Sequence, residues 1–513
     1  MTTLPRSRIS GPRFATLREQ RRLSLPAPSA AAVVHLFLLS GLLTAAVFAH
    51  GGTIPEAWLA CEFAAGLLLV SWVVASKRAT RPLAQSFPPA VVVLPLYATL
   101  QAVPLPLVLV GLLSPGRAEL HQSIARWMPQ IPSWTAVSVH PEATLDIAVR
   151  FAAYAAVYWI VRGVSARFAR NCFAVAMPIV FVAAAQSAIA LLQNLAGQPT
   201  TGSYVNRNHL AGLLEMALPF ALVAVIPIVL ALSFAPNVSL GRPRGEKRPA
   251  LAAAVWSVLA GAAAVLIFVA ILSTRSRGGL VATLVSLLVL GLAALYRSTL
   301  PRKKWLLAAL LPALLAAAFV YLPSENLARR FTHLLGGEAL RREGRVLLWS
   351  ETLDLVAAYP LLGCGFGGFE PAFLRYKRSA PMVTDTHAHN DYLELLAEAG
   401  VIGFALCLLL AARPIAAAVR ASLHGERGQE SSLALACVGS LAAILVHSFV
   451  DFNLRIPANG MVFFWVLGLC SACGSSSGAS ALRACAQRSR TASEPRQKGY
   501  ARFTTVGEQP GRP

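Results

Sequence analysis

Residues 251–296 have the sequence LAAAVWSVLAGAAAVLIFVAILSTRSRGGLVATLVSLLVLGLAALY, in which two long apolar runs flank a short polar link. An α-helix rises about 1.5 Å per residue, so it needs roughly twenty apolar residues to cross a hydrocarbon core of about 30 Å. The runs at 251–273 and 279–296 are close to that length. This stretch therefore predicts two membrane-spanning helices joined by a tight turn.

Similar runs recur along the 513 residues, of which 56% are hydrophobic and only 13% are charged. Soluble proteins carry about 25% charged residues, so this composition excludes an ordinary soluble protein. We predict an all-α, polytopic membrane protein with about twelve transmembrane helices. The predicted runs are 30–49, 57–76, 89–113, 145–162, 172–193, 209–234, 251–273, 279–296, 305–322, 392–412, 432–450 and 458–475. Pro95, Pro104 and Pro106 predict that the third run is kinked or split.

The formal net charge of +22 would suggest nucleic-acid binding in a soluble protein. In a membrane protein it first indicates orientation, because Lys and Arg near the ends of spans collect in the cytoplasm. With the N-terminus inside, thirty of the 45 basic residues fall in cytoplasmic segments and fourteen in exterior segments, with Arg150 inside the fourth run. Both ends of the chain are therefore predicted to be cytoplasmic.

The predicted organisation has a basic cytoplasmic arm at 1–29, a transmembrane domain at 30–475 and a disordered cytoplasmic tail at 476–513. The transmembrane domain carries a large exterior loop, 323–391, between spans nine and ten. The arm also fits an export signal, but a retained first span is preferred because many spans follow. The cysteines lie mostly in apolar runs and predict no disulfide framework, and Cys470-x-x-Cys473 lacks a second ligand pair.

Two exterior segments are long. Segment 114–144 contains four prolines with Trp127 and Trp134, which is typical of a loop lying against the membrane interface. In the second, 344–358 has the apolar spacing of an amphipathic helix, and LLGCGFGGF follows it. This glycine stretch matches a dinucleotide fingerprint formally, but no strand precedes it, so a tight turn is preferred. A backbone nest for a phosphate stays open as an alternative.

Residues 384–391, TDTHAHND, place two histidines, two aspartates and an asparagine at the outer end of the tenth span. Three hypotheses fit. Asp391 with Glu394 resembles a helix cap. Asp385, His387, His389 and Asp391 alternate and would share one face of an extended segment, as metal ligands could. An imidazole could also act as an acid or base, because it titrates near neutral pH.

Two further exterior links contain cations. Arg275 and Arg277 lie in the link between the runs quoted first, where arginine is costly unless it is paired or functional. Their guanidinium groups suit phosphate oxygens, although an interfacial turn with snorkelling arginines is an equal alternative. Arg207 and Asn208 precede the sixth span, and we expect Glu215, two turns inside that span, to pair with an arginine or to be functional.

Five blocks in order resemble the bacterial O-antigen ligase and polymerase superfamily of inner-membrane proteins. They are VNRNHLAGLLEMALPF, STRSRGGLVATLVSLLVLG, GRVLLWSETLDLVAAYPLLGCGFGGF, HAHNDYLELLAEAGVIGF and HSFVDFNLRIPANG, and they span residues 200–470 approximately. The resemblance implies a membrane glycosyltransferase without metal or other cofactor. Such enzymes move a glycan from undecaprenyl diphosphate to an acceptor hydroxyl at the periplasmic face. The acceptor belongs to lipid A-core in ligases, to a growing glycan in polymerases and to a protein in oligosaccharyltransferases.

Carried over by motif, the resemblance implies that Arg277 and Arg345 hold the diphosphate and that His389 is the general base. His387 is the alternative base. Charge develops on the leaving diphosphate and the acceptor hydroxyl must lose a proton, so two arginines and an imidazole suit the reaction. Attack from the opposite face would invert the anomeric carbon, and an O-antigen ligase-like activity is preferred. Further residues expected to bind substrate are Arg275, His387, Asn390, Arg207, Asn208 and Glu215.

Two hypotheses of other classes compete. A transporter of lipid-linked sugars would line a path with arginines and carboxylates, but the charged cluster lies at one face and the two halves of the span map show no repeat. A metal hydrolase would use the alternating set from Asp385 to Asp391. The expected partners are a lipid-linked glycan, a glycan or lipid acceptor and membrane lipid, with no nucleic acid.

Overall fold

The computed structural model describes residues 27–77, 90–168, 171–234, 247–297, 344–379, 384–425 and 428–473. Within these residues the chain is helical, apart from one short two-stranded ribbon, so the predicted all-helical class is confirmed. The predicted ninth run at 305–322, the tail at 476–513 and nearly all of the basic arm lie outside the described residues.

Nine of the described helices are long and apolar enough to cross a membrane. They are α2 (Ala30–Phe48), α3 (Pro55–Lys77), α7 (Pro141–Arg167), α8 (Met177–Leu195), α9 (Arg207–Phe234), α10 (Lys247–Thr274), α11 (Arg277–Arg297), α17 (Asp391–His424) and α18 (Gln429–His447). Two shorter apolar helices are α4 (Ala90–Ala102) and Pro457–Cys473. Together these helices coincide with each predicted run that the structure describes.

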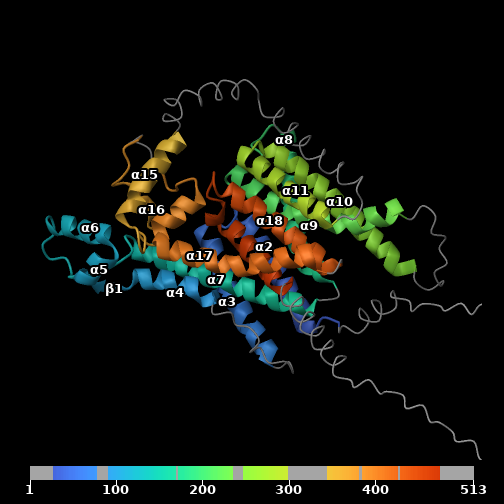
Figure 1. Ribbon diagram of the computed structural model, residues 1–513, viewed down its shortest axis with the longest axis horizontal. Helices are drawn as coiled ribbons and strands as arrows, with labels where there is room; N and C mark the ends of the chain where they lie inside the picture. The colour runs from blue at the N-terminus through green and yellow to red at the C-terminus, as the bar shows by residue number, and fades with distance from the viewer. Residues whose placement is uncertain are drawn as a thin grey trace, which may run out of the picture. The chain divides into compact units, whose positions relative to one another are not determined.

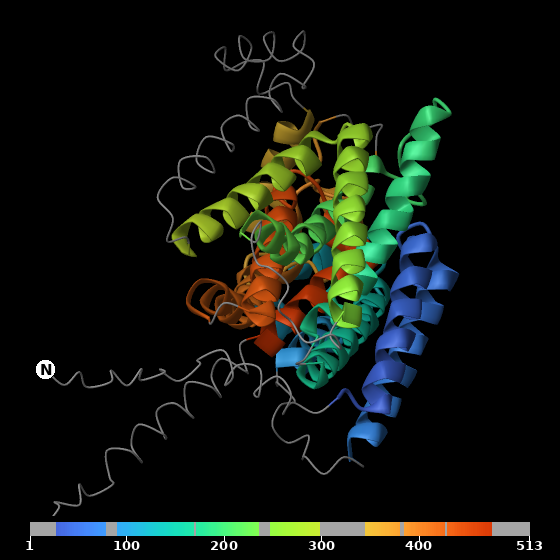
Figure 2. The same ribbon diagram turned by 90° about the vertical axis from the view of Figure 1, so that its right-hand side faces the viewer.

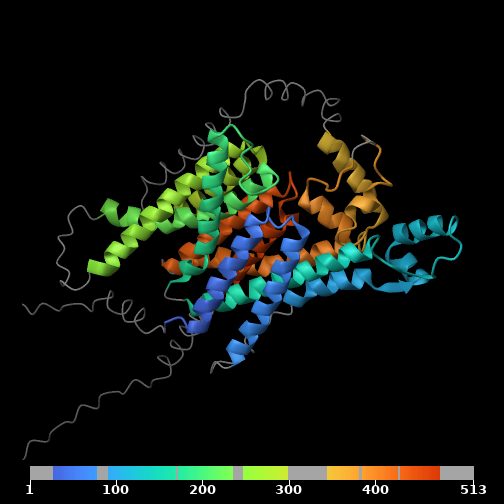
Figure 3. The ribbon, with the colours of Figure 1, turned by 180° about the vertical axis from the view of Figure 1, so that it is seen from behind.

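Helix α9 lies at the centre of the described bundle. It packs against α8, α10, α11 and α18, and its side chains from Leu210 to Ala221 are almost entirely buried. Helices α2 and α3 lie side by side and pack against α7, as Figures 2 and 3 show from two sides. On its other flank α7 runs beside α4 (Figure 1). A bundle of this kind leaves the ends of its helices free to carry polar side chains.

The third predicted run is split, as its prolines indicate. Helix α4 contains Pro95 and ends at Ala102, after which β1 (Pro104–Pro106) pairs antiparallel with β2 (Trp134–Ala136). Helices α5 (Leu107–Leu113) and α6 (Pro115–Ala125) fill the connection, forming the small lobe at the left of Figure 1. Trp127 and Trp134 are both exposed there, in keeping with the predicted aromatic anchors.

Segment 344–379, which is predicted to be exterior, contains the predicted amphipathic helix as α15 (Gly344–Ala358), followed by α16 (Phe369–Phe373). Leu348 and Leu355 of α15 join Phe369 and Phe373 in a separate apolar cluster. Because α15 packs against α17, this cluster fixes segment 344–379 on α17. The segment therefore lies over the polar residues that precede α17.

Helix α17 is longer than the predicted run 392–412 and is broken at Gly400, whose φ of 62° is not helical. The glycine turn 360–365 inserts at the break. Cys364 N donates to Ala397 O and Gly365 N donates to Glu398 O, while Val401 N donates to Pro360 O. Backbone groups cannot stay unpaired in a membrane, so this insertion makes the interruption of α17 possible.

Candidate active site

The turn between α18 and the helix Pro457–Cys473, residues 447–455, is the meeting point of the polar side chains. Segments far apart in the sequence contact it: the start of α9, the start of α11, α15 and the residues before α17. Each of these segments is an end of a helix that the sequence placed outside. Their convergence on one turn places the predicted site residues at one end of the bundle.

Asp451 lies at the centre of this turn and is almost fully buried. Its Oδ1 is 3.3 Å from His389 Nδ1, and its Oδ2 accepts a hydrogen bond from Asn208 Nδ2 at 2.7 Å. Burial favours the neutral carboxyl, but the hydrogen bonds from His389 and the Phe452 N–H, with His209 nearby, hold the pKa of Asp451 well below its usual range. The ionised carboxylate accepts a hydrogen bond from the Nδ1–H of His389. The other ring nitrogen, Nε2, is then free to accept a proton.

His389 is also conformationally unusual. Its φ is 49°, and the only other non-glycine residues with positive φ in the described part of the chain are His50 and Arg275. Such backbone strain clusters at functional sites, where surrounding contacts hold it. His389 keeps about a third of its side chain exposed, with 35% accessible. The ring is therefore oriented by a buried carboxylate and still open to a substrate.

His387 has a different environment. Its Nδ1 lies 2.8 Å from Glu394 Oε1, and its ring stacks on Phe452 at a centroid distance of 4.0 Å. Burial lowers the pKa of His387, but the Glu394 carboxylate outweighs that effect and raises the pKa above its ordinary value. Trp349 of α15 fixes the same segment by donating to Ala388 O at 3.0 Å. The surroundings of His387 thus favour a protonated, structural imidazole.

Two of the predicted arginines lie at the same turn, Arg345 by direct contact and Arg277 through the residue that follows it. Arg345 donates from Nη1 to Val450 O at 2.9 Å. Arg277 is the first residue of α11, and Gly278 after it packs so tightly that an added Cβ would lie 2.7 Å from the His447 ring and 2.9 Å from Val450. Both arginines are exposed, and the structure records no ion pair for either with the described carboxylates. The site therefore presents two cations near His389.

The other predicted cations lie at the starts of α9 and α11. Arg275 directly precedes α11 with a φ of 53°, and Arg207 begins α9. Both side chains are exposed. Asn208, one residue further, contacts Asp451 and therefore touches the site through its amide.

Glu215 does not pair with an arginine among the described residues, so the first of its two predicted alternatives is wrong. The carboxylate is fully buried and meets His447 Nδ1 at 3.0 Å, between α9 and α18. The start of α11 is close, since a Cβ at Gly279 would lie 3.4 Å from Glu215 Oε2, but the Arg277 side chain is exposed. His447 at the end of α18 faces the carboxylate instead. His447 packs against Gly278 and Glu215 packs against Gly279, so the pair supports the start of α11.

The proposed cap by Asp391 is also wrong by one residue. Asn390 is the N-cap of α17, and its side chain accepts from Tyr392 N and Leu393 N. Asp391 Oδ2 accepts instead from Ser448 Oγ at 2.8 Å and Leu454 N at 3.1 Å, which fastens α17 to the turn. The amide of Asn390 caps the helix because Asp391 points back to the turn.

The alternating set from Asp385 to Asp391 does not form a metal site in the described residues. Asp385 pairs with Lys377, whereas His387, His389 and Asp391 have the separate partners given above. Across the described ranges, no three side chains of His, Cys, Asp or Glu converge as metal ligands do. The extended segment separates these side chains, since each is directed to a different neighbouring element.

The phosphate nest is likewise excluded. In the glycine turn each backbone N–H from Gly363 to Gly368 has a partner within the protein. Gly367 N, for example, donates to Glu398 Oε1 at 2.9 Å. Gly363, Gly365 and Gly367 all have positive φ. The glycines therefore serve a tight turn that enters the break of α17, as the preferred interpretation had it.

Arg455 is a residue that the sequence interpretation overlooked. Its guanidinium pairs with Glu398 and lies 3.3 Å from Glu394 Oε1, so one partly buried cation is shared by two buried carboxylates. Glu394 in turn holds His387, which couples the glycine turn to the site. His447, Asp451 and Arg455 share the block HSFVDFNLR, and charged residues so close to a span are a signal that could have identified them.

Comparison with known proteins adds to this geometry. Residues 262–408 match the family model described as O-antigen ligase. This chain therefore contains a segment that is similar to the O-antigen ligase family, and we call that segment the O-antigen ligase domain. It is also a distant homologue of the exopolysaccharide production protein ExoQ of Rhizobium meliloti (strain 1021), with 24% identity over 267 residues. That alignment covers 50% of this chain and about half of ExoQ, 54%.

The O-antigen ligase domain contains Arg277, Arg345, His387 and His389. Asp451, which orients His389, lies outside its limits, as do Asn208 and Glu215. The site is therefore assembled from the domain and from helices on both sides of it. The resemblance to the superfamily is confirmed, and the chain is a multi-pass membrane protein.

Proposed function

We propose that the protein transfers an O-antigen-type glycan from a polyprenyl diphosphate carrier to an acceptor hydroxyl, as an O-antigen ligase does. The observation that carries this proposal is the convergence of Arg277, Arg345 and the His389–Asp451 pair on the turn 447–455. A transfer of this type needs a base for the acceptor and cations for the leaving group, and both are present at one place.

The chemistry follows from these side chains. The acceptor oxygen attacks the anomeric carbon while its proton moves to His389 Nε2. The bond between that carbon and the phosphate oxygen breaks, and its electron pair leaves with the diphosphate. Attack from the face opposite the leaving group inverts the anomeric carbon. Asp451 keeps Nδ1 protonated and stabilises the imidazolium that forms.

The arginines act on the leaving group. Guanidinium donates several N–H groups in a plane that fits phosphate oxygens, and its charge offsets the negative charge that grows on the diphosphate. Arg277 and Arg345 are free of carboxylate partners among the described residues, so their charge is directed at substrate. In this proposal the arginines supply the stabilisation for which other glycosyltransferases use a metal.

His389 suits the role of base better than His387. A general base must be neutral before it reacts, whereas Glu394 raises the pKa of His387 and so favours its protonated form. His387 also has its face covered by Phe452. We assign His387, Asn390, Asn208 and Glu215 to positioning, and Arg275 and Arg207 to binding of the extended substrate.

The site belongs to the periplasmic face of the inner membrane in this proposal. The positive-inside count puts every segment that contributes to the site on the exterior side. Polar residues gather at the helix ends instead of along a midplane path, which supports an enzyme over a transporter.

The test is transfer activity in purified protein with a lipid-linked glycan. We expect His389→Ala, Arg277→Ala and Arg345→Ala each to lose at least about 10²-fold in rate while the protein still inserts in the membrane. Arg126→Ala is a matched control, because Arg126 is an exposed arginine on the lobe next to α6. Near wild-type transfer by the His389 variant would refute the general-base assignment.

A polymerase is the second candidate, because the chain is similar to an exopolysaccharide production protein. Ligase and polymerase need the same leaving-group chemistry, so the site residues do not separate them. Deletion of the gene followed by gel analysis of lipopolysaccharide does. Bare core with accumulated carrier-linked polymer indicates a ligase, whereas core bearing single repeats indicates a polymerase. A protein acceptor would leave lipopolysaccharide unchanged.

A further inference from the structure

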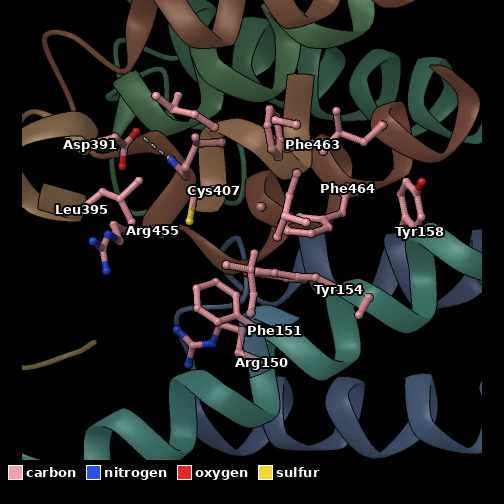
Figure 4. A pocket seen from close by; sticks show the side chains of 18 of the residues that line it. Arg150, Phe151, Tyr154, Tyr158, Asp391, Leu395, Cys407, Arg455, Phe463 and Phe464 are labelled. Carbon is pink, nitrogen blue, oxygen red and sulfur yellow. Dashed lines mark hydrogen bonds between the residues drawn. The ribbon is translucent and has the colours of Figure 1, made fainter. Parts of the chain in front are cut away.

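A cavity of about 220 Å³ lies between α7, α17 and the helix Pro457–Cys473. Its wall is mostly apolar, and Figure 4 shows Tyr154, Tyr158, Phe463 and Phe464 around it. This volume is several times the roughly 30 Å³ that a water molecule occupies in the liquid, but an apolar wall does not hold water well. We call it the α7–α17 cavity.

One side of the α7–α17 cavity is polar. Arg150, Asp391 and Arg455 line it, on the side away from Tyr158 in Figure 4. Arg455 is already paired with Glu394 and Glu398, so its charge is not available to a ligand. Asp391 is 5% exposed, and its Oδ1 has no hydrogen-bond partner among the described residues. A buried oxygen without a partner is costly, and a ligand that donates to it would remove that cost.

Arg150 is the second unsatisfied group. Its Nε is buried without a hydrogen bond in the described part of the chain, although Glu62 of α3 lies 3.7 Å away as an ion-pair partner. The guanidinium carbon lies 5.6 Å from the centroid of Trp58, so α3 contacts the arginine through both Glu62 and Trp58. An arginine within a membrane helix is expensive and is typically functional. Its open side faces the cavity.

These features specify an amphipathic ligand. We propose that the α7–α17 cavity binds the apolar chain of the lipid-linked glycan, with the head group at Arg150 and Asp391. The apolar wall accepts the first part of the chain, and Arg150 donates to an oxygen of the phosphate next to the chain. A hydroxyl of the first sugar donates to Asp391 Oδ1, while Arg277 and Arg345 hold the other phosphate. This proposal rests on the proposed function and adds the place where the carrier lipid is held.

The location connects the cavity to the chemistry. Asp391 is two residues beyond His389, and its N–H donates to Ser448 O at 2.9 Å. A head group at Asp391 is therefore next to the turn 447–455, which carries the His389–Asp451 pair. A membrane lipid that is not a substrate would not need its head group beside this turn. Arg150 also lies outside the O-antigen ligase domain, so the cavity draws on a part of the chain that the family match does not reach.

A matched pair of variants tests the chain site. Ala411 lines the cavity, whereas Ala412, the next residue of α17, is exposed and does not. In nanodiscs, a photoactivatable polyprenyl phosphate should label α7 and α17 of the wild type and of Ala412→Trp. Labelling of Ala411→Trp should fall about tenfold, because the indole fills the space of the apolar chain. Equal labelling of both variants would refute the proposal.

A second arm separates the substrate lipid from ordinary membrane lipid. A photoactivatable phosphatidylglycerol should label the cavity weakly and be displaced by unlabelled polyprenyl phosphate. Strong labelling that polyprenyl phosphate does not displace would show a general lipid site and overturn the proposal.

Arg150→Gln tests the head group independently of packing. It should raise the KM for the lipid-linked donor about tenfold with the KM for the acceptor unchanged. An unchanged donor KM would contradict the role of Arg150. Photolabelling does not need turnover, so labelling without any glycan transfer by the wild type would keep the cavity assignment and refute the proposed function alone.

Discussion

Asp451 is the residue through which His389 is oriented, and its substitution separates orientation from folding. Asp451→Asn keeps the size of the side chain but removes the negative charge that holds the Nδ1 proton of His389. We expect the rate of transfer to fall by about 10²- to 10⁴-fold.

Asp354→Asn is the control for Asp451→Asn, because Asp354 is an aspartate in an exposed pair with Arg378 on α15. It should transfer at the wild-type rate. Gel filtration and thermal unfolding in detergent establish that both variants are folded. Unchanged transfer by Asp451→Asn would mean that His389 needs no carboxylate partner.

His387 predicts a pH dependence of stability. Glu394 raises the pKa of His387 in the folded state, so the folded protein binds this proton more tightly than the unfolded chain does. The stabilisation is complete below the unfolded pKa of about 6.5 and is lost as the pH rises through the higher folded pKa. The thermal midpoint of the wild type should exceed that of His387→Gln most at acid pH. A difference that stays constant from about pH 5.5 to pH 9 would contradict the ion pair.

At the scale of elements, the break in α17 positions the site. Gly400 has a positive φ, and a Cβ at this residue would overlap the carbonyl of Leu361. Gly400→Ala should lower the free energy of unfolding by roughly 1–3 kcal/mol, because the strained backbone and the glycine turn cannot both be kept. Thermal unfolding in detergent measures the change.

Gly291→Ala is the matched control for Gly400→Ala. Gly291 lies within helix α11, and nothing lies within 4 Å of the position that its Cβ would take. Alanine is the better helix former, so this variant should be as stable as the wild type or more stable. Equal destabilisation by both substitutions would show that the break does not depend on Gly400.

At the scale of the whole molecule, the orientation of the bundle can be tested by labelling. Gln122 is exposed on α6, on the side predicted to be periplasmic, and Gln429 is exposed at the start of α18, on the side predicted to be cytoplasmic. A membrane-impermeant maleimide should label Gln122→Cys in intact cells. It should label Gln429→Cys only after the inner membrane is permeabilised. The reverse pattern would place the site in the cytoplasm and exclude a periplasmic acceptor.

Much of this protein follows from its sequence. Runs of about twenty apolar residues fix the helices and their approximate limits, because backbone hydrogen bonds in lipid can be satisfied only within a helix or a closed barrel. The spacing of apolar residues also predicted α15, and the prolines predicted the split third run. The motif blocks identified Arg277, Arg345 and His389, all of which the structure places at one end of the bundle.

What the sequence did not determine is which polar group meets which. Glu215 pairs with His447, Asp451 holds His389, and Arg455 pairs with two carboxylates, although these partners lie far apart along the chain. Burial makes each such contact obligatory but does not name the partner, since several cations and histidines were near enough in sequence to serve. Only the packing of α9, α17 and α18 decided the partners, and with them the turn 447–455 as the place where the site residues meet.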